Sequence, residues 1–323
     1  MALPNIHLVA AKKMREGNIK VSLPGGKRTL QRIAKTFVVV TIFYFLGRSL
    51  YRNWRQVDFM HLHFNVPLLM VSFFFLWTYS LLSVYGWRLI LKRLNISLSF
   101  LKGLRIFFYS ELGKYLPGKI WTFAGRMYFC QKIGIPNSKT FVSMVLELAL
   151  TIISGILIFL ISLLFSSRFR MDINPFLLVI VGVLILTNIH PKILVRIINF
   201  FLRLLKKEPI RIDLNFSQIL IMTAYYCIIW FCFGIAFYFL INSVTFITPS
   251  KIPILTGSFA ISNTIGVMAL FAPAGLGVRE GILAVLLNNF FPISLAILLS
   301  LLSRIWVSIG ELVMMGISTR IRL

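Results

Sequence analysis

The chain has 323 residues, of which 58% are hydrophobic and only 13% are charged. Soluble domains carry roughly 25% charged residues. The apolar residues come in blocks long enough to cross a hydrocarbon core, which takes about 20 residues of helix. The composition therefore excludes a soluble globular protein and predicts an all-α, polytopic membrane protein.

The formal net charge is +25, with 34 Lys and Arg residues against 9 Asp and Glu residues. The charged residues lie in short clusters between the apolar blocks, a placement that fits the positive-inside rule and attraction to anionic lipid headgroups. We therefore expect membrane lipids as partners and no nucleic acid.

The cysteines and histidines do not indicate a metal or redox site. The 3 cysteines are odd in number and lie in apolar segments, which does not suit a disulfide framework or a metal site. His61 and His63 are two residues apart and would not share a helix face. We expect no cofactor and no bound metal ion.

The chain begins with a basic tail, residues 1–32, whose only acidic residue is Glu16. The first apolar run starts too late for a cleavable signal and is followed by further spans. We expect the N-terminus in the cytoplasm. The first two spans are predicted at about 33–50 and 66–91.

The segment at about 103–134 differs from these spans because Pro117-Gly118 interrupts it. Proline removes a backbone donor and kinks a helix, whereas glycine permits a chain reversal. Neither half is long enough to cross the membrane alone. The segment is therefore predicted to be a broken or re-entrant element.

Further spans follow along the rest of the chain. They are predicted at about 141–165, 175–189, 219–241, 252–271 and 293–318. A basic stretch at 192–211 is expected on the cytoplasmic membrane surface. A second broken element is predicted at about 272–291, and residues 320–323 form a short basic tail. The membrane domain, 33–319, would hold seven or eight transmembrane helices in two loosely related halves, an arrangement compatible with an inverted repeat.

Polar residues at membrane depth mark the candidate site. A charge at the centre of a lipid-facing helix costs about 2.5–3.5 kcal/mol, so such residues normally face a bundle interior or a water-filled cavity. Broken helices at corresponding positions in the two halves of a transporter indicate a substrate-binding site between the halves. The candidate residues for binding a lipid headgroup are Glu111, Lys114, Pro117, Gly118, Lys119, Arg126, Glu147, Gly275, Gly277, Arg279, Glu280, Arg304 and Glu311.

Two roles stay open for these residues. Their Lys and Arg members could bind a phosphate while the carboxylates orient them. The same charges could instead hold helices together as buried ion pairs. Arg304 and Glu311 are seven residues apart, so they are expected on one face of a helix.

Two motifs resemble a known family. Tyr115–Trp121, Gly125-Arg126 and Glu147 resemble the first block of the lysylphosphatidylglycerol synthase transmembrane family, also called the flippase-like domain. Pro273–Glu280, followed by Arg304 and Glu311, resembles its second block. The resemblance extends over about residues 36–318.

The resemblance implies a role in lipid movement. Fused members of that family carry an aminoacyltransferase domain that makes lysylphosphatidylglycerol, and their membrane part is implicated in moving this lipid across the bilayer. Because the chain ends at Leu323, we expect a stand-alone member without that domain. Trp121 and Thr122 stand where many members have a Gly-Glu pair, as in stand-alone members associated with lipid-linked glycans.

The sequence therefore predicts a flippase-like transporter of a phospholipid or a polyprenyl-phosphate-linked saccharide, in the inner cell membrane, rather than an enzyme. It would act in envelope lipid or polysaccharide biosynthesis, with other proteins of that pathway as partners. Two alternatives stay open. One is a membrane-embedded glycosyl- or acyltransferase, although no Asp-x-Asp pair or His/Asp pairing is found. The other is a non-catalytic scaffold of a polysaccharide assembly.

Overall fold

A computed structural model describes residues 64–115, 120–165, 175–188, 215–269 and 275–321, together with residues 196, 199 and 272. The predicted span at 33–50 and most of the basic stretch at 192–211 lie outside the described residues. So do Pro117, Gly118 and Lys119. Within the described ranges the regular structure is all helical, without strands.

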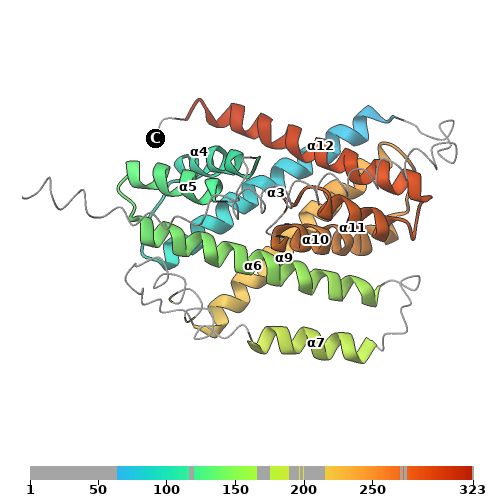
Figure 1. The fold of residues 1–323 in the computed structure, drawn as a ribbon, viewed down its shortest axis with the longest axis horizontal. Coiled ribbons are helices and arrows are strands. Elements are labelled where there is room, and N and C mark those ends of the chain that lie inside the picture. The colour runs from blue at the N-terminus through green and yellow to red at the C-terminus, as the bar shows by residue number, and fades with distance from the viewer. Residues whose placement is uncertain are drawn as a thin grey trace, which may run out of the picture.

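The helices follow the predicted segments closely (Figure 1). In chain order they are α3 (Val66–Arg93), α4 (Phe100–Glu111), the 3-10 helix η3 (Leu112–Tyr115), α5 (Trp121–Lys132), α6 (Asn137–Leu164), α7 (Pro175–Asn188), α9 (Phe216–Asn242), the 3-10 helix η4 (Pro249–Lys251), α10 (Ile252–Met268), α11 (Val278–Leu287) and α12 (Ile293–Ser318).

Among the described residues, four helices are long and apolar enough to cross a membrane, namely α3, α6, α9 and α12. The protein is therefore a multi-pass membrane protein. The spans predicted at 175–189 and 252–271 correspond to α7, with 14 residues, and α10, with 17 residues. Both are shorter than the roughly 20 residues that a perpendicular crossing requires.

Local sequence explains where the helices begin. The side chain of Asn65 accepts a hydrogen bond from the N–H of Leu68 at 3.1 Å, which satisfies a free donor in the first turn of α3. Ser99 does the same for Lys102 at the start of α4, at 3.4 Å. Pro136 and Pro292 directly precede α6 and α12. These residues mark the positions at which the four helices begin.

Helices α3 and α9 cross at the centre of the bundle and run antiparallel (Figure 1). The N–H of Asn65 before α3 donates to the carbonyl of Ser243 after α9 at 2.8 Å. At the other end, Ile90 of α3 shares a buried cluster with Met222 of α9. This pair forms the axis around which the remaining helices pack.

Two pairs of short helices flank this axis. Helix α4 packs against α5, and α10 packs against α11. Helix α10 also runs antiparallel to α6, since Gly257 lies against Ser162 and Gly155 lies against Thr264. Small residues at such crossings let helix backbones approach closely, which stabilises helix packing in membranes. We call α4–α5 the first hairpin and α10–α11 the second hairpin.

The first hairpin packs against α12 as well as α3. Lys114 at its tip contacts Glu311 of α12, and Arg105 near its start donates to the carbonyl of Ile321. Helices α4 and α12 are therefore antiparallel. Because α12 also packs against α11, it lies beside both hairpins.

An aromatic core lies between α9, α10 and α12. The ring centre of Phe233 is 4.1 Å from that of Phe259 and 5.6 Å from that of Trp306. The ring of Tyr79 meets Phe233 edge to face at 4.8 Å. Such offset and edge-to-face pairs are the favoured arrangements of aromatic rings. This core lies beside the charged residues of the second hairpin, since Phe259 packs against Arg279.

Candidate functional site

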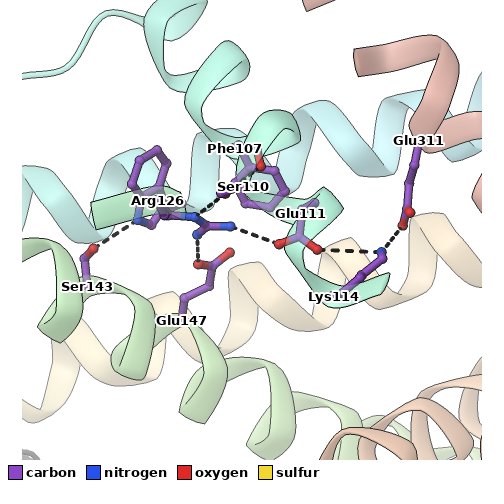
Figure 2. Close-up of polar contacts among 9 residues, drawn as sticks. Phe107, Ser110, Glu111, Lys114, Arg126, Ser143, Glu147 and Glu311 are labelled. Carbon is purple, nitrogen blue, oxygen red and sulfur yellow. Dashed lines mark hydrogen bonds and ion pairs between the residues drawn. The ribbon is translucent and has the colours of Figure 1, made fainter. Parts of the chain in front are cut away.

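Arg126 of α5 lies at the centre of a buried group of polar side chains (Figure 2). Its Nε donates to the hydroxyl of Ser110 at 3.0 Å. Its Nη2 donates to Glu111 at 3.0 Å, and its Nη1 donates to Glu147 at 2.5 Å. The residue is 1% exposed. All three guanidinium nitrogens therefore have protein acceptors.

Two aromatic rings pack against the same guanidinium. Its Cζ lies 4.8 Å from the ring centre of Trp87 and 4.3 Å from that of Phe107. The indole N–H of Trp87 donates to Ser143 of α6 at 3.0 Å, which holds the ring in place. A desolvated cation–π contact contributes about 2 kcal/mol. Arg126 is thus held by carboxylates and by aromatic rings together.

The ion pairs continue from Glu111 toward α12 (Figure 2). The Nζ of Lys114 is 3.6 Å from Glu111 and 2.5 Å from Glu311. Glu111 and Lys114 are three positions apart, which places them on the same side of a helical turn. The result is a continuous chain of charges from α6 to α12. We call Glu111, Lys114, Arg126, Glu147 and Glu311 the first charge group.

The second hairpin turns at two glycines. Gly275 and Gly277 have φ angles of +70° and +81°, in a region that glycine adopts without steric cost. The N–H of Gly277 donates to Glu280 at 2.7 Å. A carboxylate in this position also interacts favourably with the helix dipole. Helix α11 opens directly after this turn, at Val278, within the broken element predicted at about 272–291.

Glu280 also faces a cation of α12. Its second carboxylate oxygen lies 3.7 Å from Nη1 of Arg304, and the residue is 1% exposed. Arg304 and Glu311 lie on the same continuous helix, seven residues apart. Helix α12 therefore contacts the second hairpin through Arg304 and the first hairpin through Glu311.

Arg279 lies next to Glu280 but has different surroundings. It is 7% exposed, and its Cζ lies 4.5 Å from the ring centre of Phe259 on α10. Its Nη2 is buried, with no hydrogen-bond partner among the described residues. We call Arg279, Glu280 and Arg304 the second charge group.

The ion pairs of the two hairpins have opposite orientations. In the first hairpin the cation, Arg126, lies on the short helix and the carboxylate, Glu147, on the following long helix. In the second, the carboxylate Glu280 lies on the short helix and the cation Arg304 on the long one. No group of three or more His, Cys, Asp or Glu residues in the described ranges is arranged to hold a metal ion.

The described charged candidates predicted from the sequence fall into these two groups, which α12 connects, and Gly275 and Gly277 form the turn of the second hairpin. The sequence did not indicate their aromatic and hydroxyl neighbours. These are Trp87, Phe107, Ser110 and Phe259. In a chain with 30 Phe residues a single ring carries no local signal. Ser110 was detectable only as a polar residue beside Glu111.

Comparison with known proteins identifies one family. The family model described as Lysylphosphatidylglycerol synthase TM region matches residues 32–309, which include both hairpins and most of α12. The match contains every member of the two charge groups except Glu311. No curated protein matches the chain.

Proposed function

We propose a lipid-transport function for this chain, which belongs to the lysylphosphatidylglycerol synthase TM family. It would act as a flippase-like transporter that moves a lipid with a phosphate-containing headgroup between the two leaflets of a cell membrane. A phospholipid and a polyprenyl-phosphate-linked saccharide both fit this description. The N-terminus would lie in the cytoplasm, as the basic tail predicts.

The observation that carries the proposal is the placement of charge inside an apolar bundle. Two charge groups lie at the two hairpins, and α12 contacts both through Glu311 and Arg304. Charges at membrane depth are costly unless they are paired or serve a polar pathway. A row of such residues offers a headgroup polar contacts along a route that would otherwise be hydrocarbon.

The helix arrangement supports an inverted repeat. Each half has the order long, short, short, long: α3, α4, α5 and α6, then α9, α10, α11 and α12. The equivalent helices α3 and α9 are antiparallel, and α10 packs against α6 as α4 packs against α12. We infer that the two hairpins re-enter the membrane from opposite sides. With α7 and the span predicted at 33–50, the four long helices would then give six crossings, fewer than the seven or eight predicted from the sequence, because α10 belongs to a re-entrant hairpin.

This arrangement favours transport without covalent chemistry. Inverted repeats allow alternating access, in which one half rocks against the other around a site between them. The headgroup would contact the charged side chains while the acyl or prenyl tails stay in lipid. Basic side chains would neutralise the phosphate, and carboxylates would keep those side chains oriented. The protein would then act on its substrate as a transporter and not as an enzyme.

Leaflet exchange in proteoliposomes tests the proposal. Purified protein would be reconstituted with fluorescent phosphatidylglycerol or with a fluorescent polyprenyl-phosphate-linked sugar, and the outer leaflet would be bleached by an impermeant reductant. We expect faster loss of the inner-leaflet signal than in protein-free liposomes for at least one of the two lipids. Gly182→Ala, a change with no neighbouring atoms within 4 Å, is a control that should behave like the wild type. Exchange equal to that of empty liposomes for both lipids would contradict the proposal.

A further inference from the structure

We infer that the phosphate of the transported lipid binds at Arg279 of the second charge group, and that Arg126 is a structural residue. This inference rests on the proposed function and specifies its binding site. It follows from a structural difference between Arg126 and Arg279, two buried arginines that have similar neighbours in the sequence.

Arg279 is a buried cation that forms no ion pair with a carboxylate among the described residues. Its exposed fraction is 7%, and no hydrogen bond or ion pair joins it to another described residue. The neighbouring carboxylate, Glu280, accepts from the N–H of Gly277 through Oε2, and its Oε1 lies 3.7 Å from Nη1 of Arg304 without a hydrogen-bond partner among the described residues. A buried charge without a partner is strongly destabilising. Among the described residues, the second charge group therefore has more cations than carboxylates, which favours the binding of an anion.

Arg126 is the comparison case within the same protein, a buried arginine whose guanidinium nitrogens all have acceptors. Its three nitrogens donate to Ser110, Glu111 and Glu147. The first charge group has three carboxylates for two cations, whereas the second has one carboxylate for two cations. An anion entering the membrane domain would be repelled by the excess carboxylate of the first group and attracted by the excess arginine of the second.

The surroundings of Arg279 suit a phosphate in particular. Phe259 packs against its guanidinium at 4.5 Å, which fixes the plane of the group. The Cβ of Arg279 lies close to Gly266 of α10, where an added Cβ would be only 3.0 Å away. A guanidinium held in this way presents parallel N–H donors, a geometry that matches two oxygens of a phosphate. We therefore assign a phosphate mono- or diester as the chemical class of the ligand.

Thermal unfolding of the purified protein in detergent, followed by tryptophan fluorescence, tests the assignment. The probes are dioctanoyl phosphatidylglycerol, dioctanoyl glycerol and inorganic phosphate. We expect the phospholipid to raise the unfolding midpoint of the wild type, and dioctanoyl glycerol to leave it unchanged. Arg279→Gln should weaken the phospholipid effect by about tenfold or more in ligand concentration, since hydrogen bonds to a charged group are lost.

A second readout separates a binding role from a structural one. Without lipid, Arg279→Gln should unfold at the same or a higher temperature than the wild type, because it removes an uncompensated buried charge. Arg126→Gln should unfold at a lower temperature. Arg320→Gln removes an exposed positive charge outside both groups and should keep the phospholipid effect.

Three results of the unfolding experiment would overturn the assignment. The first is an undiminished phospholipid effect in Arg279→Gln. The second is a lipid-free Arg279→Gln variant that unfolds well below the wild type, which would reveal an internal partner. The third is an equal effect of inorganic phosphate, which would make free phosphate the ligand. If Arg279→Gln still exchanges lipid between leaflets, this binding site is refuted and the transport function stands. If the wild type shows no exchange but Arg279→Gln has lost the phospholipid effect, the transport function is refuted and the binding site stands.

Discussion

The two hairpins contain the same kinds of charged residues but use them differently. In the first, Arg126 donates through all three nitrogens, and ion pairs run without a gap to Glu311. In the second, Glu280 accepts from the N–H of Gly277 and faces Arg304, whereas Arg279 packs against the ring of Phe259 and has no hydrogen-bonded carboxylate among the described residues. The first hairpin is electrostatically complete and the second is not.

This difference shows how a membrane-embedded charge is to be judged. Burial alone does not separate the two arginines, since both are more than nine-tenths buried. The number and kind of acceptors around each guanidinium does separate them. A saturated arginine stabilises the fold, and an unsaturated one is available to a ligand. The predictions below test this comparison, beginning with the largest expected effect.

Arg126→Gln should be the most damaging substitution. It leaves Glu111 and Glu147 without their shared cation, and breaking a buried ion pair from one side typically costs about 3–5 kcal/mol. Abundance in the membrane and the thermal midpoint measure the loss. The double variant Arg126→Gln/Glu147→Gln should recover part of it, because Lys114 still serves Glu111. A single variant with wild-type abundance and midpoint but no leaflet exchange would instead make Arg126 a headgroup ligand.

Gly275→Ala should be the next most damaging. Its φ of +70° disfavours alanine, and a Cβ there would lie 2.8 Å from the carbonyl oxygen of Gly266. Left-handed backbone costs about 1–2 kcal/mol, and overpacking adds about 1–3 kcal/mol, so we expect a total of about 2–5 kcal/mol. Gly134→Ala is the matched control, since Gly134 has a φ of +82° but no atoms within 4 Å of the added Cβ. Equal unfolding midpoints for the two variants would show that the close approach of Gly275 to Gly266 does not contribute to the loss of stability.

Glu280→Gln should impair leaflet exchange more than stability. Glutamine can still accept from the N–H of Gly277, and Arg304 keeps its other interactions, so we expect a stability loss of about 1–3 kcal/mol. Exchange should fall by about tenfold or more, because the second charge group loses the carboxylate that orients its cations. Exchange rates and membrane abundance would be measured together.

The double variant Glu280→Gln/Arg304→Gln sharpens this test. If the cations of the second charge group bind the headgroup, neutralising Arg304 as well should not restore exchange. If Glu280 and Arg304 form only a structural ion pair, the double variant should recover both abundance and exchange. Full recovery of exchange would therefore show that the charges of the second hairpin, like those of the first, stabilise the fold and do not bind the headgroup.

Single cysteines at Asn289 and Lys102, at the open ends of the hairpins, should change stability least, within about 0.5 kcal/mol, because these two positions are exposed. They test whether the hairpins enter from opposite sides. In a background without the three native cysteines, Asn289→Cys should react with an impermeant thiol reagent on intact cells. Lys102→Cys and Lys206→Cys should react only after permeabilisation. Labelling of Asn289→Cys and Lys102→Cys from the same side would rule out the inverted arrangement.

The sequence by itself determined the membrane character, the long helices and the turn of the second hairpin. These features depend on local chemistry: the length of an apolar run, a proline before a helix, or a glycine where φ is positive. The predicted spans at 66–91, 219–241 and 293–318 accordingly agree with α3, α9 and α12 to within a few residues. The segments around 33–50 and 192–211 stay predictions.

Only the tertiary structure decided which charges pair. From the sequence, the candidate carboxylates and cations formed one central cluster with open partnerships. Lys114 and Glu311, which form an ion pair, are separated by 197 positions in the chain. Arg304 and Glu311 share a helix face, yet seven residues place them about 10 Å apart along the axis. Each therefore meets a different hairpin.

The two arginines illustrate the physical reason for this limit. Arg126 and Arg279 both follow a glycine-containing break, and each has a glutamate nearby in the chain. Whether such an arginine is satisfied depends on the acceptors that other helices bring within about 3 Å, which is the range of a hydrogen bond. Those helices are placed by close packing at distant small residues, such as Gly155 against Thr264 and Gly257 against Ser162. Because this packing is not encoded near either arginine, their different roles emerge only once the bundle is assembled.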